Sequence, residues 1–169
     1  LHNLKSDLSI SIIEPSDQSL YQAAWTLVGA GAYDKDKTIK PMTEVMPNYV
    51  NWIKDHAESF APESNSVKTS NGEYSYDYLV VCPGLKINYA GIPGLQESIG
   101  KNNVCTNYSA DMAVYTWECL KNLKGGTLLF TEPPMPIKCA GAPQKIAYLA
   151  ADHLKQKGLL NESNLEFLC

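Results

Sequence analysis

The stretch from Gly125 to Lys157 constrains the fold of this chain most strongly, because strand, loop and helix signals follow one another within it. Thr127–Phe130 is a short apolar run with the size and composition of a buried strand. Further on, side chains recur at helical spacing: Ile146, Leu149, Ala150, His153 and Leu154. Gly158 then provides a stop signal after the lysines that end this segment. The stretch therefore predicts a strand, a connecting loop and an amphipathic helix, in that order.

Cys139 lies in that loop, directly after Lys138 and just before the predicted helix. Pro143 fits the first turn of the helix, where its missing N–H costs nothing. The positive end of the helix and the Lys138 ammonium both favour a thiolate over a thiol. Prolines at positions 133, 134 and 136 stiffen the approach to this residue. Cys139 is therefore a candidate reactive cysteine, although a small buried hydrophobe is the alternative on these grounds.

Composition narrows the classes of function. The chain has 169 residues, 44% of them hydrophobic, which suits one domain or parts of two. A net charge of −4 gives no electrostatic basis for binding nucleic acid or an anionic membrane surface. No run of about 18 apolar residues predicts a transmembrane helix. The five cysteines form no CxxC pair and no zinc spacing, so we expect a reducing compartment and no metal site.

Both ends of the sequence suggest a longer protein. Leu1–Lys5 has the character of the tail of a helix, and Asn164–Cys169 that of a strand. We therefore expect this chain to be an internal part of a larger fold.

The alternating strand pattern of Leu8–Ile13 ends at Glu14. A hydrophobic strand ending in an acidic residue is typical of the second strand of a dinucleotide-binding unit, where the carboxylate receives the ribose hydroxyls. A solvated turn residue is the alternative. The glycine fingerprint expected about 20 residues earlier would precede Leu1. Gly29-Ala-Gly31 does not replace it, because the third glycine is absent.

Antiparallel strands are predicted over the next part of the chain, at Ile53–Phe60, Ser66–Thr69 and Glu73–Val81. Asn71-Gly72 is a strong signal for a two-residue hairpin turn between the last two. A glycine turn, Cys82-Pro83-Gly84, follows.

Helical or irregular segments are predicted elsewhere. Tyr21–Ala32 suits a packed surface helix or loop, and Thr43–Trp52 a helical or irregular crossover. Asp111–Leu123 is a predicted helix that Thr106 or Ser109 can cap, with Cys119 expected in the core.

Four segments together resemble one known family: Leu1–Ser16, Trp25–Ala32, Asn107–Ser109 and Pro136–Lys145. They are similar to sulfide:quinone oxidoreductases of the mitochondrial type, and the last resembles the segment that carries one of the two redox cysteines. The resemblance implies an α/β fold, namely a partial tandem Rossmann-like flavoprotein with a three-stranded β-meander, of the FAD-dependent disulfide-reductase type. It further implies that residues 1–123 are a partial FAD-binding domain lacking the N-terminal glycine fingerprint. Residues 124–169 would begin a second dinucleotide-binding-like domain.

The resemblance also assigns expected roles to individual residues. Cys139 is the expected redox cysteine, and FAD the expected cofactor. Glu14 would hold the ribose, the Gln22 amide would contact the cofactor, and the Ala57 backbone would read the adenine edge. Gly84 matches the glycine of the family's turn, although the preceding Cys-Pro departs from the usual pattern.

The implied reaction is oxidation of hydrogen sulfide through a cysteine persulfide, with electrons passing via FAD to a quinone. The implied partners are hydrogen sulfide, a small sulfur acceptor and ubiquinone. The inner mitochondrial membrane is the implied location, with membrane contact through regions outside this chain. The partner cysteine is also expected outside this chain. The isolated chain is therefore expected neither to hold FAD tightly nor to turn over. Some bacterial relatives have a cysteine in a setting like that of Cys105, whose role stays open.

Two alternatives remain at this point. The first is a NADH:quinone oxidoreductase of the same architecture, which would need a glycine-rich turn after Phe130. The chain has Thr131–Pro136 there instead, which is poorly suited to wrap a pyrophosphate. The second alternative is a non-catalytic module of the same fold in which Cys139 is merely buried.

Overall fold

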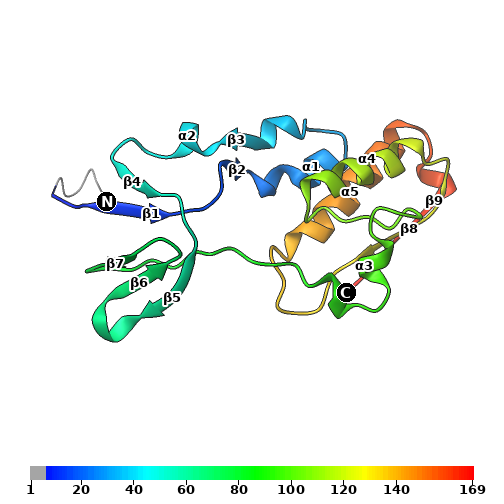
Figure 1. Cartoon of the computed structure of the whole chain (residues 1–169). Coiled ribbons are helices and arrows are strands. Elements are labelled where there is room, and N and C mark those ends of the chain that lie inside the picture. Colours follow the sequence, from blue (N-terminus) through cyan, green and yellow to red (C-terminus); the bar gives the residue numbers. More distant parts are fainter. Residues whose placement is uncertain (1–6) are drawn as a thin grey trace. The chain divides into compact units, whose positions relative to one another are not determined.

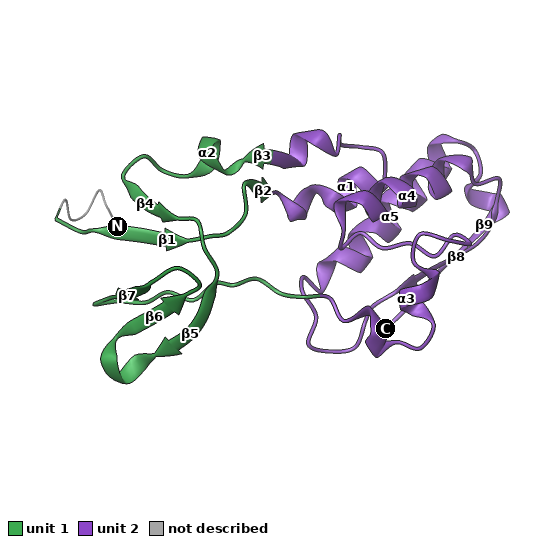
Figure 2. Ribbon diagram, in the orientation of Figure 1, with its two compact units in different colours: residues 1–19, 40–86 green, residues 20–39, 87–169 purple. Residues whose placement is uncertain are grey.

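The computed structural model describes residues 7–169. These residues form two compact units, each built from separate segments of the chain (Figure 2). The first unit contains the residues up to 19 together with 40–86, and the second contains residues 20–39 and 87–169. Figure 1 shows the order of their helices and strands along the chain. The helix tail predicted at Leu1–Lys5 lies outside the described residues.

A pair of parallel strands begins the first unit: β1 (Ile10–Ile13) and β4 (Val50–Ile53). β1 lies within the predicted strand Leu8–Ile13. The crossover predicted over Thr43–Trp52 is helical only at its start, in α2 (Met42–Val45). The prediction was wrong for residues 50–52, because pairing with the distant strand β1 makes that segment extended. Local sequence does not reveal such a tertiary partner.

A three-stranded antiparallel sheet completes the first unit, as predicted. Its strands are β5 (Ala57–Ala61), β6 (Ser66–Thr69) and β7 (Glu73–Ser75), in that spatial order. A short 3-10 helix, η3 (Pro62–Ser64), connects the first two strands. The meander therefore follows directly after the parallel pair along the chain.

The hairpin turn between β6 and β7 lies one residue earlier than predicted. The Thr69 N–H donates to the Gly72 carbonyl at 2.8 Å, so Ser70 and Asn71 are the two residues between them. Asn-Gly directs such a turn when both residues adopt positive φ, and neither does here. Asn71 instead donates from its backbone N–H and its Nδ2 to Asp55 Oδ2, at 2.9 and 3.1 Å.

Asp55 anchors this turn to the segment between β4 and β5. The residue is only 7% exposed, and its Oδ1 also accepts from the His56 N–H at 2.8 Å. These hydrogen bonds, with the Thr69 side chain as the largest cause, lower the pKa of Asp55 to about 2, although burial opposes the shift. The ionised carboxylate is therefore the form that supports the folded hairpin.

We expect the stability of the first unit to fall as the pH drops from about 4 to about 2. The folded-state pKa lies below the ordinary value of 3.8, so the unfolded chain takes up the proton first and acid favours unfolding. Asp55→Asn should lower the melting temperature near neutral pH and remove this part of the acid dependence. Thermal melts followed by circular dichroism against pH measure both effects. Asp77→Asn, at an exposed carboxylate of the same unit, is the control; equal behaviour of the two variants would contradict the prediction.

The predicted strand Glu73–Val81 is much shorter in the structure. β7 ends at Ser75, and residues 76–88 contain no helix or strand. Tyr78 is 91% exposed and Val80 is 81% exposed. The apolar composition suggested the buried end of a strand, but no strand within residues 7–169 pairs with this segment.

A second two-stranded sheet is formed by β2 (Gln18–Leu20) and β3 (Ile39–Pro41), and residues 21–38 connect these strands along the chain. Those residues form the 3-10 helix η1 (Gln22–Ala24), helix α1 (Trp25–Gly29) and the 3-10 helix η2 (Asp36–Thr38). The predicted surface helix or loop is therefore a helix. Its residues are more buried than expected, because Trp25 and Val28 belong to the core of the second unit.

That core joins α1 to α4 (Ala110–Asn122). Trp25, Val28 and Ala113 are buried together, and the Trp25 indole N–H donates to Thr38 Oγ1 at 3.3 Å. Two short elements precede α4: η4 (Tyr89–Gly91) and α3 (Leu95–Ser98). The helix predicted at Asp111–Leu123 is thus confirmed. Ser109 occupies its N-cap position without a side-chain capping bond, and Cys119 is only partly buried.

The remaining part of the second unit is a strand–helix–strand arrangement. β8 (Gly126–Thr131) and β9 (Ser163–Leu168) pair in parallel, and α5 (Gly141–Gln156) connects them through the short η5 (Leu160–Glu162). The strand, loop and helix predicted in this stretch are confirmed. β8 was expected to be buried, which was wrong: Leu129 is 58% exposed, because within residues 7–169 only β9 pairs with β8.

Helix α5 begins and ends as its sequence predicts. Ile146, Ala150 and Leu154 are buried at the expected spacing, and Leu154 is fully buried, which stabilises the fold by about 2 kcal/mol. Gly158 has a φ of 72°, in the left-handed region, and its N–H donates to the Lys155 carbonyl at 3.1 Å. The glycine therefore ends the helix.

The observed elements confirm the predicted α/β class with its three-stranded antiparallel sheet. The boundary expected between residues 123 and 124 falls inside the second unit. That boundary stays a prediction.

Candidate functional site

Cys139 lies two residues before the first residue of α5, and it is exposed. Ala140 is the N-cap, and the Ala142 N–H donates to the Cys139 carbonyl at 2.8 Å. Pro143 falls in the first turn, as predicted. Cys139 has a φ of 54°, a left-handed conformation that costs a residue other than glycine about 1–2 kcal/mol. The alternative of a buried core cysteine does not hold in this structure.

Lys138 is held at both its side chain and its main chain. Its Nζ donates to Gln22 Oε1, and its carbonyl oxygen accepts a hydrogen bond from the Tyr108 hydroxyl at 2.8 Å. Gln22 is 116 residues away from Lys138 in the sequence. The structure therefore brings two of the predicted site residues, Gln22 and Cys139, to neighbouring positions in the second unit.

Tyr108 was not among the predicted site residues. Burial raises the pKa of its phenol, and the negative charges of Cys139 and Glu132 raise that pKa further. At neutral pH the hydroxyl is therefore protonated and can donate to Lys138. Tyr108 belongs to the Asn107–Ser109 segment noted above, but no spacing in the sequence indicated its contact with the cysteine loop.

The other three predicted cofactor residues lie in the first unit. Glu14 follows β1 directly, and its N–H donates to the carbonyl of Ile53, the last residue of β4, at 3.0 Å. Ala57 is exposed at the start of β5. Gly84 is exposed with a φ of 76°, and a Cβ there would meet no atom within 4 Å, so backbone conformation rather than space calls for glycine.

Cys105 lies in a protected environment. It is half-buried, and its Sγ donates to the Asn103 carbonyl at 3.4 Å. Burial, followed by the charge of neighbouring Cys119, raises the pKa of the Cys105 thiol to about 12. A thiol that stays protonated at neutral pH is a poor nucleophile.

We expect Cys105 to react with iodoacetamide far more slowly than exposed Cys139 at neutral pH. Raising the pKa from 9.0 to about 12 lowers the thiolate population about 1,000-fold. Peptide mass spectrometry of timed alkylation reactions measures the two rates separately. In urea the rates should converge; a Cys105 rate in the native protein matching that of Cys139 would contradict the burial.

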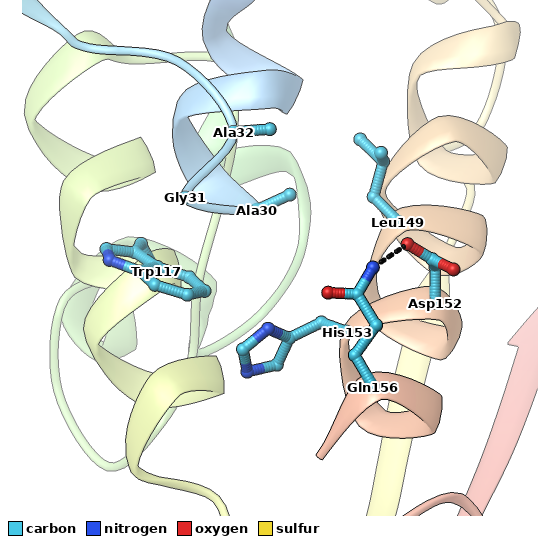
Figure 3. Close-up of a pocket in the computed structure, with 8 residues that line it drawn as sticks. All are labelled: Ala30, Gly31, Ala32, Trp117, Leu149, Asp152, His153 and Gln156. Carbon is cyan, nitrogen blue, oxygen red and sulfur yellow. Dashed lines mark hydrogen bonds between the residues drawn. The ribbon is translucent and has the colours of Figure 1, made fainter.

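A pocket lies farther along α5, between this helix, α4 and the residues that follow α1 (Figure 3). Its volume is about 220 Å³. The rings of Trp117 and His153 meet edge to face with centroids 5.0 Å apart, and Gln156 Nε2 donates to Asp152 Oδ2 at 2.6 Å. Burial, followed by the charge of Lys157, lowers the pKa of His153. The five predicted site residues do not line this pocket.

The sequence is similar to mitochondrial sulfide:quinone oxidoreductases. It is 42% identical over 168 residues to the protein of Dictyostelium discoideum, a match covering 98% of this chain and 37% of that protein. It is 39% identical over 160 residues to the protein of Mus musculus, covering 94% of this chain and 36% of that protein. The chain thus spans little more than a third of the length of these relatives. No protein-family model matches it.

The fold is similar to that of a solved structure as well. The X-ray structure of the sulfide:quinone oxidoreductase from the hyperthermophilic bacterium Aquifex aeolicus matches with a TM-score of 0.77 at 26% sequence identity. The match covers 99% of this chain and 38% of the solved one. The likeness to this enzyme thus extends across both units.

Proposed function

Because this chain is homologous to the mitochondrial sulfide:quinone oxidoreductases over the region it spans, we propose that its protein oxidises hydrogen sulfide and reduces a quinone. The observation that carries this proposal is the exposed Cys139 before α5, within a segment that resembles a redox-cysteine segment of that family. Cys139 is the proposed redox cysteine. Ubiquinone is the proposed electron acceptor, and a small molecule is the proposed sulfur acceptor.

FAD is the proposed cofactor, and the geometry around Glu14 fits its adenosine half. Glu14 stands where β1 and β4 end, the edge at which open α/β sheets bind nucleotides. One carboxylate oxygen, Oε1, accepts from the Ser16 N–H at 2.7 Å. Within residues 7–169 its other oxygen has no hydrogen-bond partner, so it is free to receive a ribose hydroxyl. Ala57 and Gly84, in the same unit, are proposed to contribute backbone contacts.

The proposed chemistry at Cys139 is thiol–disulfide exchange. Hydrosulfide attacks a disulfide between Cys139 and a second cysteine, in a part of the protein that this chain does not span. One cysteine then carries a persulfide, and the other leaves as a thiolate. FAD, when bound, supplies an acceptor for the electron pair and a route to the quinone. The partly positive start of α5 favours the negative charge on the sulfur.

The inner mitochondrial membrane is the proposed location, supported by the mitochondrial relatives. None of the helices formed by residues 7–169 has the length and apolar character needed to cross a bilayer. From the resemblance to that family, contact with the membrane and with the quinone is proposed for parts of the protein outside this chain.

Anaerobic titration of the full-length protein with sulfide tests the proposal. We expect sulfide to bleach the visible absorbance of bound flavin, and a soluble quinone to restore it. Bleaching by NADH but not by sulfide would favour a NADH:quinone oxidoreductase. A purified protein without flavin would instead indicate a non-catalytic module of the same fold.

A further inference from the structure

The main chain at Cys139 adopts a conformation that its own sequence does not favour. A φ of 54° is uncommon for a residue other than glycine, and such a residue keeps it only where the surroundings hold it there. The hydrogen bond from the Ala142 N–H fixes the side of Cys139 toward α5. The main chain on the other side of Cys139, toward β8, also needs a restraint.

The loop between β8 and Cys139 forms few hydrogen bonds. The Glu132 N–H donates to the Leu168 carbonyl at 2.8 Å, which is the last bond of the sheet. Prolines at 133, 134 and 136 have no N–H to donate. Within residues 7–169, the hydrogen bonds formed between Glu132 and Cys139 are the two at Lys138. Of these two hydrogen bonds, the one from the Tyr108 hydroxyl is made to the main chain.

Tyr108 is itself well fixed. Its N–H donates to Thr106 Oγ1 at 3.2 Å, and the Thr116 hydroxyl of α4 contacts the Thr106 carbonyl at 3.4 Å. The ring is partly buried, and α4 packs against α1 in the core. The segment that carries Tyr108 is therefore hydrogen-bonded to α4, a helix that contributes to the core of the second unit, unlike the proline-rich loop that the phenol contacts.

We propose that Tyr108 is a positioning residue for Cys139, acting through its hydrogen bond to the Lys138 carbonyl. The contact holds the peptide unit before Cys139, and with it the left-handed conformation that directs the exposed thiol. Gln22 restrains the same residue from the side-chain end by accepting from the Lys138 ammonium. The part of this inference that concerns turnover rests on the proposed sulfide chemistry, whereas the restraint on the loop does not.

Hydrogen exchange in the full-length protein tests the restraint directly. In Tyr108→Phe we expect the backbone amides of residues 137–142 to exchange about tenfold faster, as the loss of one hydrogen bond predicts. Exchange in α4 should stay unchanged. Tyr148→Phe is the matched control, because Tyr148 lies on α5 and is 72% exposed. Unchanged exchange at residues 137–142 in Tyr108→Phe would overturn the proposal.

Kinetics of the same variants test the role in turnover. Tyr108→Phe should keep its flavin, but sulfide should reduce that flavin about tenfold more slowly, because the thiol is less well oriented. The rate at which iodoacetamide alkylates Cys139 should change by less than about threefold, because this reaction needs no such orientation. Equal losses in both reactions would indicate general structural damage and overturn the role. If sulfide fails to reduce the wild-type flavin, the proposed function fails, while the exchange result still decides the restraint.

If Tyr108→Phe does not fold, Gln22→Met gives a second test. It removes the acceptor for the Lys138 ammonium but leaves the Tyr108 contact intact. We expect a smaller increase in exchange at residues 137–142, about twofold to threefold, since a released ammonium remains hydrated. An increase as large as the tenfold expected for Tyr108→Phe would show that the side chain, not the carbonyl, carries the restraint.

Discussion

Replacing Cys139 by serine is expected to abolish sulfide-driven reduction of the bound flavin while leaving the flavin in place. A serine hydroxyl cannot form the disulfide or the persulfide, so the rate should fall by on the order of 1,000-fold or more. The FAD contacts proposed for Glu14, Ala57 and Gly84 belong to the first unit and are unaltered. Stopped-flow absorbance of the anaerobic full-length protein measures the reduction rate, and the absorbance spectrum before mixing gives the flavin content.

Cys169→Ser is a suitable control, because Cys169 is also an exposed free cysteine within this chain. It should reduce its flavin at the wild-type rate. If Cys139→Ser also keeps the wild-type rate, Cys139 has a structural role only, and the proposed function loses its main support. If Cys139→Ser loses its flavin, the residue instead contributes to the cofactor site.

Gly31→Ala is expected to destabilise the second unit strongly. Gly31 has a φ of 71°, and a Cβ there would lie 2.5 Å from the Trp117 ring. An alanine therefore combines the cost of a left-handed backbone with an overpacked contact, together about 2–5 kcal/mol of unfolding free energy. Moving the Trp117 ring would also disturb its edge-to-face contact with His153. Urea unfolding followed by tryptophan fluorescence measures the change.

Gly158→Ala separates the two causes. Gly158 has nearly the same φ, 72°, but a Cβ there would meet no atom within 4 Å. Its replacement by alanine should lower the unfolding free energy by only about 1 kcal/mol, which is the cost of the left-handed backbone alone. The difference between the two variants measures the contact with Trp117. Equal destabilisation by Gly31→Ala and Gly158→Ala would show that the indole moves aside at no cost.

Local signals in the sequence predicted the elements that bear on Cys139. The strand at residues 127–130, the helix that begins near Pro143 and the end of that helix at Gly158 all depend on neighbouring residues, and the structure contains each of them. The position of Cys139 beside a helix start follows from the same signals. These features were predictable because turn chemistry and helical periodicity act over only a few residues.

Features that depend on distant partners were not predictable in this way. β4 forms because β1 lies beside it, and the segment after Ser75 is not a strand because no described strand pairs with it. The contacts of Lys138 with Gln22 and Tyr108 join residues that no periodic pattern relates. Hydrogen bonds between side chains far apart in sequence leave no local trace, so only the three-dimensional structure shows them.

The second unit is built from two stretches of the chain, residues 20–39 and 87–169, and these are synthesised at different times on the ribosome. Trp25 and Val28 emerge early, but Ala113, their partner in the buried cluster, is translated more than 80 residues later. At typical elongation rates the two apolar side chains wait roughly 4–17 s for it. During that interval they are available to chaperones, and the residues of the first unit, the last of which is residue 86, are translated before it ends. The second unit is therefore the one that most needs protection by chaperones while it is being synthesised.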